Sequence, residues 1–403
     1  MSGSSPGRTL RPAGRHQRPG ATMPGRNPGE PHRTATSLEL LFDLCFVIAV
    51  AQASESLSEA VADGHALTGC LRFALVFFTV WWAWMNFTWF ASAYDPDDVP
   101  YRLTVLFQIA GSLLLAAGVP QAFHEGDLRV ITLGYVVLRT ALAALWLRAA
   151  RADAGRRRTA LRFAGGVTGC QIGWVGVLFV PGAAQLPLVL VLIIAELAVP
   201  VWAESAGRTP WHPHHIAERY GLFVLIVLGE SVAAAASAVR GAFGRHHDAG
   251  ALYLLAAGGL LLVFAMWWLY FARPAHTLLA TTHVDHRNRF TWAYGHYLVF
   301  ASAAAVGAGL ATYAEVLARD SEAPSPAAGA AVTVPAAIFL FTVWAIHVRP
   351  HRRGGVERIV FPAVSVAVLA AAFSPAPALA AGLLAAALAG AVTVADRTGP
   401  APR

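Results

Sequence analysis

The 403-residue chain contains no lysine and only three cysteines, and charged residues make up just 13% of it. Soluble proteins carry about 25% charged and about 45–50% apolar residues. Here 56% of the residues are hydrophobic and the mean hydropathy is +0.53. We therefore predict an all-α integral membrane protein.

Motifs for several kinds of chemistry are also missing. The cysteines lie singly in apolar segments, so neither a disulfide framework nor a zinc site is expected; they are Cys45, Cys70 and Cys170. No H-E-x-x-H or P-loop sequence is present. The material left for catalysis is Glu230-Ser231, His296 and the segment 211–215. We expect no enzymatic activity, no cofactor and no metal.

Apolar runs long enough to cross a membrane, roughly 17 to 25 residues each, occur about twelve times. The predicted spans lie near 36–54, 69–91, 102–123, 128–149, 161–181, 186–204, 218–239, 250–272, 291–315, 329–348, 357–373 and 376–395. Residues 1–35 are rich in Pro, Gly, Ser and Arg, which predicts a disordered basic cytoplasmic tail. Residues 396–403 form a short C-terminal tail.

The arginines predict the orientation, because they supply every fixed positive side-chain charge. With a cytoplasmic N-terminus, most of the 30 arginines fall on the cytoplasmic side, above all within 148–162 and 349–358. The positive-inside rule then favours two cytoplasmic termini and an even number of helices in the plasma membrane. The net charge of +7 indicates contact with anionic membrane lipid, and not with nucleic acid.

The two halves of the chain resemble each other. Segment 39–52 aligns with 218–230, since each begins with a carboxylate and continues as an apolar stretch that ends in a polar residue. A tryptophan pair follows late in the second helix of each half. We predict two parallel six-helix repeats, residues 36–205 and 206–395, with a pathway between them. The alternative is that apolar sequences look alike by composition.

Three blocks carry a family resemblance: ELLFDLCFVIAVAQ at 39–52, WWAWMNFTWFASAYDPDD at 81–98, and HIAERYGLFVLIVLGES at 215–231. In this order they resemble the signature of the bacterial low temperature requirement protein A family, over roughly residues 36 to 395. The resemblance implies a polytopic membrane protein linked to growth in the cold, and it specifies no substrate or catalytic residue. The matching positions are Glu39, Asp43, Gln52, Trp82, Asp95, Pro96, Asp98, Arg102, His215, Glu218, Arg219, Gly229 and Glu230.

A second resemblance is to the unconventional potassium channels of lysosomes and bacteria, whose six-helix units carry R-x-x-x-F-S-D in their first helix. The counterpart here is Leu41-Phe42-Asp43, without the upstream arginine and with Phe42 in place of the serine. The corresponding helix of the second half lacks the aspartate. This resemblance implies an ion channel as an alternative function.

Five titratable side chains fall within predicted spans, where an unpaired charge is costly: Asp43, Arg139, Glu196, Glu230 and His296. Arg139 is the one fixed cation among them, so we expect it to pair with a carboxylate, although spacing does not say which. One reading is a structural clamp between helices. The other is that a carboxylate, first of all Glu230, takes up and releases a proton during transport.

Other charged groups lie near the predicted cytoplasmic ends of helices. Glu39 and Asp43 are one turn apart and repel unless a cation lies opposite. We expect Arg219 to contact lipid phosphates or the acidic turn 95–98, which also offers a clamp for Arg102 or a gate for cations.

Histidines cluster before the seventh predicted span. His212, His214, His215 and Glu218 offer nitrogen and oxygen ligands, but their loose spacing favours a solvated loop over a metal site. The segment 283–287 is a similar candidate.

Three classes of function remain open. The preferred one is a proton- or cation-coupled transporter of a small solute or ion, in which Glu230 and Asp43 bind the cation or proton and Arg139 tunes them. The other two are a structural or stress-adaptation membrane protein and a membrane-embedded enzyme, and an ion channel is the alternative within the first class. Membrane lipid is the expected partner, and the oligomeric state is left open.

Overall fold

The computed structural model describes residues 23, 25–27, 30, 33–243, 249–281, 286–319, 325–351 and 355–398. Within these ranges all regular elements are helical. The first half contains α1 (Ser37–Ala62), α2 (Ala66–Ala93), α3 (Val99–His124), α4 (Arg129–Ala152), α5 (Arg157–Val177) and α6 (Gly182–Glu204). The second contains α7 (Pro213–Phe243), α8 (Ala249–Phe271), α9 (Ala275–Thr281), α10 (His286–Arg319), α11 (Pro326–Val343), α12 (Gly355–Ala370) and α13 (Pro377–Thr398).

Helices occupy all twelve predicted spans. Ten helical stretches in the described ranges are long and apolar enough to cross a membrane, and 358–373 is a shorter apolar helix. Helix α5 is also not among the ten stretches, because it is rich in Gly and begins with arginines. The prediction of an all-helical membrane architecture is confirmed.

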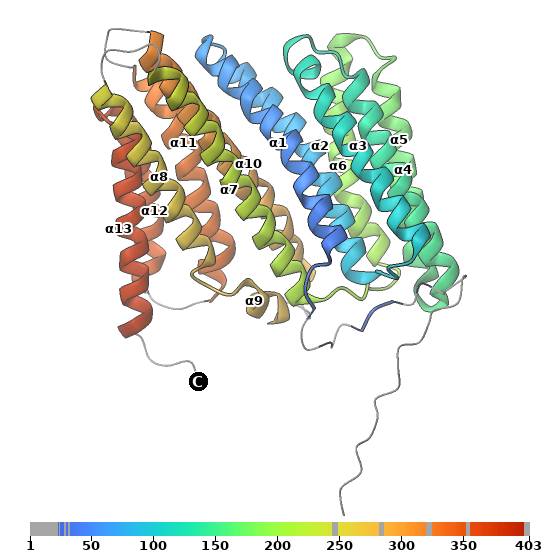
Figure 1. The fold of residues 1–403 in the computed structure, drawn as a ribbon. Coiled ribbons are helices and arrows are strands. Elements are labelled where there is room, and N and C mark those ends of the chain that lie inside the picture. Colours follow the sequence, from blue (N-terminus) through green and yellow to red (C-terminus); the bar gives the residue numbers. More distant parts are fainter. Residues whose placement is uncertain are drawn as a thin grey trace, which may run out of the picture.

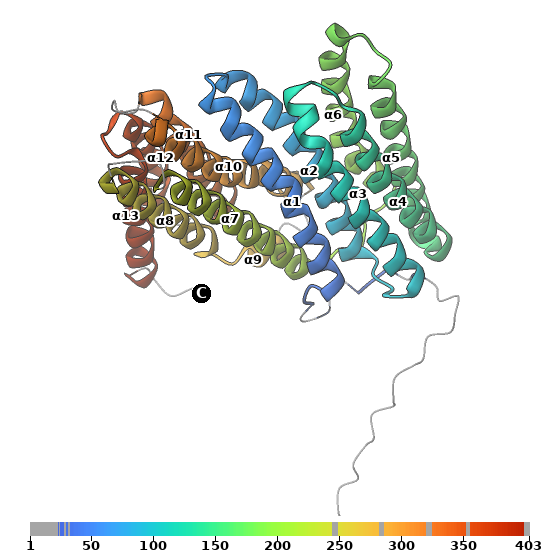
Figure 2. The same ribbon diagram turned by 45° about the horizontal axis from the view of Figure 1, so that its top comes forward.

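The helices form two neighbouring groups (Figure 1). Helices α2 to α6 lie on one side, α7 to α13 on the other, and α1 runs between them (Figures 1 and 2). Helix α1 begins and α13 ends at the same end of the bundle, at the bottom of Figure 1. We call this the terminal end and the opposite one the distal end.

Small residues bring neighbouring helices of each half into close contact. A Cβ atom added at Gly118 of α3 would lie 2.3 Å from the Ile131 nitrogen of α4. One added at Gly309 of α10 would lie 2.0 Å from the Ala331 oxygen of α11. Helices in membranes associate through such close backbone packing, because lipid offers no hydrophobic driving force between them. These glycines therefore set the spacing of the α3–α4 and α10–α11 pairs.

The chain before α1 is held against the helices where it is described. Met23 is 1% exposed, and the backbone nitrogen of Arg26 donates to the carbonyl of Ala93 at the end of α2. The guanidinium of Arg33 donates to the carbonyls of Ala91 and Ser92. These residues differ from the expected disordered tail, because their arginines satisfy carbonyls that the end of α2 leaves free.

Candidate functional site

Two carboxylates of α1 and two basic side chains of α7 meet in a buried group that we call the α1–α7 cluster: Glu39, Asp43, His215 and Arg219. Arg219 Nε donates to Asp43 Oδ2 at 2.8 Å, and its Nη2 donates to Asp43 Oδ1. Arg219 Nη1 lies 3.1 Å from Glu39 Oε1, and His215 Nε2 also lies 3.1 Å from that oxygen. None of the four side chains is more than 1% exposed.

Local sequence explains how these groups meet. Glu39 and Asp43 share one face of α1, and His215 and Arg219 share one face of α7, because each pair is separated by four residues. Thr36 caps α1, and its backbone nitrogen donates to Glu39 Oε2 at 2.8 Å, which completes a capping box. From α2, Trp84 Nε1 adds a hydrogen bond of 2.7 Å to Asp43 Oδ1. The cluster therefore joins the first helices of the two halves.

This geometry corrects the expectation for Arg219. The side chain does not lie at the lipid interface or against the acidic turn, but is fully buried against Asp43 and Glu39. The expected repulsion between the two carboxylates is offset by the single guanidinium that bridges them. A bidentate arginine–carboxylate pair satisfies the charges that burial would otherwise leave exposed to hydrocarbon.

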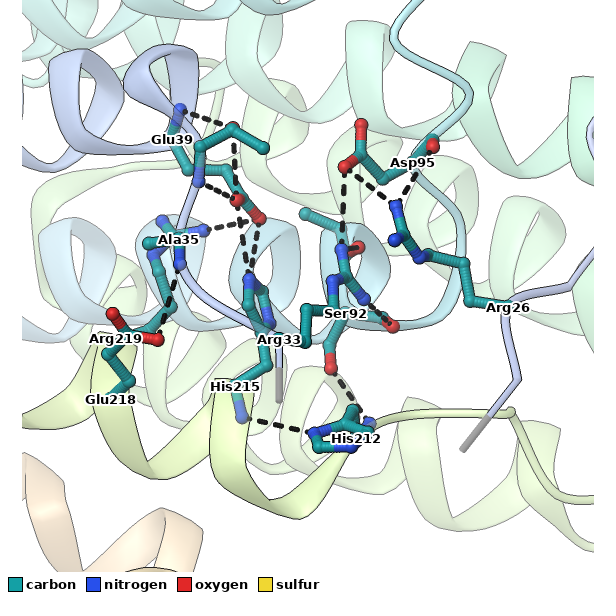
Figure 3. Close-up of polar contacts among 12 residues, drawn as sticks. Arg26, Arg33, Ala35, Glu39, Ser92, Asp95, His212, His215, Glu218 and Arg219 are labelled. Carbon is teal, nitrogen blue, oxygen red and sulfur yellow. Dashed lines mark hydrogen bonds and ion pairs between the residues drawn. The ribbon is translucent and has the colours of Figure 1, made fainter. Parts of the chain in front are cut away.

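The segment before α1 covers the terminal end of the cluster (Figure 3). The backbone nitrogen of Ala35 donates to Glu218 Oε2 at 3.2 Å, and His212 Nε2 lies 2.6 Å from the Glu30 carbonyl oxygen. Asp95 contacts both Arg26 and Arg33. Burial raises the pKa of Asp95 above its usual value, against the effect of the two guanidinium groups.

The acidic turn between α2 and α3 is a structural clamp in this structure. Arg102 donates two 2.8 Å hydrogen bonds to Asp97. Of the two arginines expected to contact this turn, Arg102 therefore does so. Asp98 caps α3 through the Tyr101 nitrogen and pairs with Arg148 of α4. Hydrogen bonds from these arginines lower the pKa values of both aspartates below their usual range.

Arg139 pairs with Glu196, which identifies the carboxylate that the sequence left open. Arg139 Nη2 lies 2.5 Å from Glu196 Oε2. Glu196 also accepts hydrogen bonds from Trp82 Nε1 at 2.8 Å and from the Tyr135 hydroxyl at 3.2 Å. All of these side chains belong to the first half, and the ion pair of Arg139 is with Glu196, not with Asp43 or Glu230.

Glu230 lies apart from both buried pairs. It is half-buried on α7, and Glu55 of α1 is close enough for the two carboxylates to repel each other. Gln52 Nε2 donates to Glu55 Oε2 at 3.2 Å. Across the described part of the chain, neither glutamate forms an ion pair. Glu230 thus remains the titratable carboxylate of the predicted set without a cationic neighbour.

His296 lies in the core of the second half. The Tyr270 hydroxyl is 3.0 Å from His296 Nε2, and His347 Nε2 is 3.3 Å from the same atom. Its Nδ1 lies 2.7 Å from the Trp292 carbonyl oxygen. None of these three contacts involves Glu230 or the α1–α7 cluster.

The histidines before α7 are not the solvated loop that we expected, because His212 is 6% exposed and His215 is fully buried. Within the ranges that the structure describes, no three His, Cys, Asp or Glu side chains are grouped so that they could hold a metal ion. Residues 283–285 of the similar segment 283–287 lie outside the described residues.

A crevice of about 370 Å³ separates the halves at the distal end. Leu57, Cys70 and Phe73 of α1 and α2 line one side, and α10 and α11 line the other. Leu57 lies about 21 Å along α1 from Asp43, at about 1.5 Å per residue. The lining of the crevice is apolar apart from a few side chains such as Tyr297, Ser302 and Thr312. The halves are therefore joined by buried charges at the terminal end, whereas at the distal end the crevice lies beside the contacts of Ser58 with Thr312 and of Asp63 with Arg319.

Sequence analysis missed several partners at these positions. Trp84 and Tyr135 carry no charge, and their roles depend on which helix lies opposite. Arg33 was assigned to the tail. Glu204 of α6 pairs with Arg289 of α10 across the two halves. The sequence indicates only that each charge lies near the end of a helix and has no partner on that helix.

The ten apolar spans and the buried charges between them define a multi-pass helical membrane protein. Residues 34–394 match the bacterial low temperature requirement A protein (LtrA) family, and the chain belongs to that family. It is also similar to an uncharacterised protein of Rhizobium meliloti (strain 1021), with 29% identity over 272 residues. The matched segment covers 64% of this chain and 64% of that protein.

Proposed function

We propose that this protein is a transporter that moves a small solute by opening the junction between its two halves alternately at each end. The observation that carries the proposal is the contrast between the 370 Å³ crevice at the distal end and the sealed α1–α7 cluster at the terminal end. Transporters built from two helix repeats alternate between such states by rocking one repeat against the other.

The α1–α7 cluster is the closure of the terminal end in this proposal. Its ion pairs join α1 to α7, and they must separate for that end to open. Buried ion pairs are suited to this role, since their Coulomb energy is largely offset by desolvation, and water entering an open state solvates both partners. Asp43 is therefore assigned to closure and no longer to binding the transported cation.

Glu230 is the group that we propose to couple transport to a proton or cation. A carboxylate in a membrane span without a cationic partner is stable only when protonated, hydrated or bound to a cation. Glu230 and Glu55 lie on the seam between α7 and α1, so a change in their charge acts on the same helix pair that the cluster holds together. Arg139 has no part in this coupling.

The lining of the crevice favours a solute with an apolar body. Pockets of this kind bind through apolar surface and gain orientation from a few polar groups. Ser58 and Thr312, whose hydroxyl oxygens lie 3.1 Å apart, bridge the two halves beside it. We propose transport and not catalysis at this crevice.

The proposal includes two parallel repeats with cytoplasmic termini. The packing of helices within each half supports the repeat. In the first half α1 packs on α2 and α3, and α3–α4, α4–α5 and α5–α6 follow. In the second half α7 packs on α8 and α10, and α10–α11, α11–α12 and α12–α13 follow; α8 also packs on α13, a contact without a counterpart of comparable extent between the described residues of α2 and α6. On this basis α9 is an insertion, and the Arg-rich terminal end faces the cytoplasm.

Cys70 is a natural reporter for a test, because it is exposed in the crevice. In a variant whose other two cysteines are alanine, a membrane-impermeant maleimide should label Cys70 from outside intact cells. Arg219→Gln should slow this labelling several-fold, because loss of the terminal closure favours the state in which the crevice is closed. Glu196→Gln, which removes a charge from an ion pair within one half, is the control. Unchanged labelling in folded Arg219→Gln protein would contradict the proposal.

A structural role is the second candidate, and the complete burial of Asp43 and Arg219 is the observation in its favour. A permanent clamp would hold the halves in one arrangement. In that case Arg219→Gln would lower thermal stability without changing the accessibility of Cys70 in the protein that remains folded.

A further inference from the structure

A second polar site lies inside the first half, away from the crevice. Arg139 of α4, Glu196 of α6 and Tyr135 of α4 meet Trp82 of α2 in one layer, at about the middle of these helices. Arg139 is 1% exposed and Glu196 is fully buried. The layer has no net charge, because it contains one arginine and one glutamate.

Several buried polar atoms near this layer have no hydrogen-bond partner among the described residues: four are donors, and one, Gln171 Oε1, is an acceptor. Nε and Nη1 of Arg139 have no partner among the described residues. The same holds for both amide atoms of Gln171 and for Trp174 Nε1, on side chains that are each 7% exposed. Buried donors without an acceptor are rare and costly.

The unpaired groups belong to one level of the helix bundle. The Tyr135 and Trp174 rings are 5.6 Å apart, and the Arg139 guanidinium lies 5.6 Å from the Tyr135 ring centroid. Because α4 and α5 are antiparallel, Arg139 is then level with Cys170 and Gln171. Cys170 is close enough to Arg139 and Glu196 to interact with both charges.

A cavity of about 40 Å³ begins one helical turn from this layer, toward the terminal end. Asn86 and Pro200 line it, one turn from Trp82 and Glu196 respectively. Met85, Trp89, Glu204 and Tyr294 also contribute to its wall. A site for one water requires about 10–15 Å³ in this measure and two to four polar partners. The cavity therefore has room for about three waters.

We propose that a chain of internal waters fills this cavity, between the first half and α10, and continues into the first half to the unpaired donors of Arg139, Gln171 and Trp174. Water fits the donors because it accepts hydrogen bonds without adding charge. An anion would leave a net negative charge in a layer that Arg139 and Glu196 already neutralise. The site is separate from the crevice and does not depend on the proposed transport.

Radiolytic footprinting of the full-length protein tests this proposal, because hydroxyl radicals formed from bound water oxidise the side chains beside it. Cysteine and methionine sulfur are readily oxidised. Met85 lines the cavity at 4% exposure, whereas Met266 of α8 is fully buried away from it, which makes a matched pair. The oxidation rate of each side chain is to be divided by the intrinsic reactivity of that residue type. The resulting ratio should be several-fold higher for Met85 and Cys170 than for Met266.

Gln171→Leu removes two of the unpaired atoms and should lower the oxidation of Cys170 several-fold while leaving that of Met85 unchanged. Trp174→Phe is the second variant if the first does not fold. Oxidation of Met85 without that of Cys170 would overturn the proposed chain, and so would protection of both equal to that of Met266. A thermal unfolding temperature that differs between chloride and gluconate in wild type, but not in Gln171→Leu, would indicate an anion and also overturn it.

Discussion

Replacing Asp43 by asparagine tests the energetic role of the α1–α7 cluster. Asparagine keeps the shape of the side chain but loses its charge, and one of its two polar atoms becomes a donor. In one orientation of the amide this donor would face Arg219 Nε, and in the other it would face Arg219 Nη2 and Trp84 Nε1. All three of these groups donate hydrogen bonds to Asp43 in wild type. Breaking a buried ion pair by removing one partner costs about 3–5 kcal/mol. Because Glu39 still contacts Arg219, we expect a loss of about 3 kcal/mol, at the lower end of this range.

The free energy of unfolding in bicelles, obtained by steric trapping, measures this loss. Glu230→Gln is the control, because it also replaces a carboxylate by an amide but breaks no ion pair, and it should change stability by less than about 1 kcal/mol. The Asp43→Leu and Arg219→Met double variant should cost less than the sum of the two single variants, since an apolar pair can replace a buried ion pair. Part of the loss should remain, because buried Glu39 then keeps His215 but loses Arg219 as a basic partner. Equal stability of Asp43→Asn and wild type, or simple additivity in the double variant, would refute this reasoning.

Two further predictions concern stability at other positions. Asp98→Asn keeps the cap of α3 but loses the charge that pairs with Arg148, so it should cost about 1–2 kcal/mol at neutral pH. The pairing lowers the pKa of Asp98, so it stabilises the fold fully above pH about 4, the usual pKa of an aspartate. Wild type should lose this stabilisation as the pH falls through the lowered pKa. A stability difference between wild type and Asp98→Asn that persists at lower pH would contradict the assignment. Gly309→Ala forces a methyl group against the Ala331 carbonyl and should cost about 1–3 kcal/mol, whereas Gly390→Ala, which meets no neighbouring atom, should be neutral or slightly stabilising. Thermal unfolding in detergent distinguishes them, and equal effects would contradict the packing argument.

The helices and the membrane class could be predicted from sequence, because both depend on local properties. Apolar length predicted helices in all twelve spans, although α3 begins at Val99, three residues before the predicted start at 102. The identity of charge partners depends on which helices become neighbours, which no spacing within one helix encodes. Asp43 and Arg219 are 176 residues apart, so the sequence located both charges but not their contact.

Burial near helix ends was the main source of error. His215 and Arg219 follow a polar loop and resemble an interfacial anchor, yet the chain before α1 covers them and α1 supplies their carboxylates. The tryptophan pairs used to align the halves show the same limit. Trp81 and Trp82 are at most 1% exposed, whereas Trp267 and Trp268 are 42% and 48% exposed. Similar sequence therefore occupies different surroundings in the two halves.

The distance between the halves across the distal crevice tests the proposed alternation most directly. Spin labels at Cys70 of α2 and at Ile338→Cys of α11, with the other two native cysteines replaced by alanine, report it by double electron–electron resonance. Two distance populations are expected in lipid nanodiscs, and Glu230→Gln, which imitates the protonated carboxyl, should shift their ratio. A single distribution that neither pH nor Glu230→Gln changes would contradict transport by movement of the two halves.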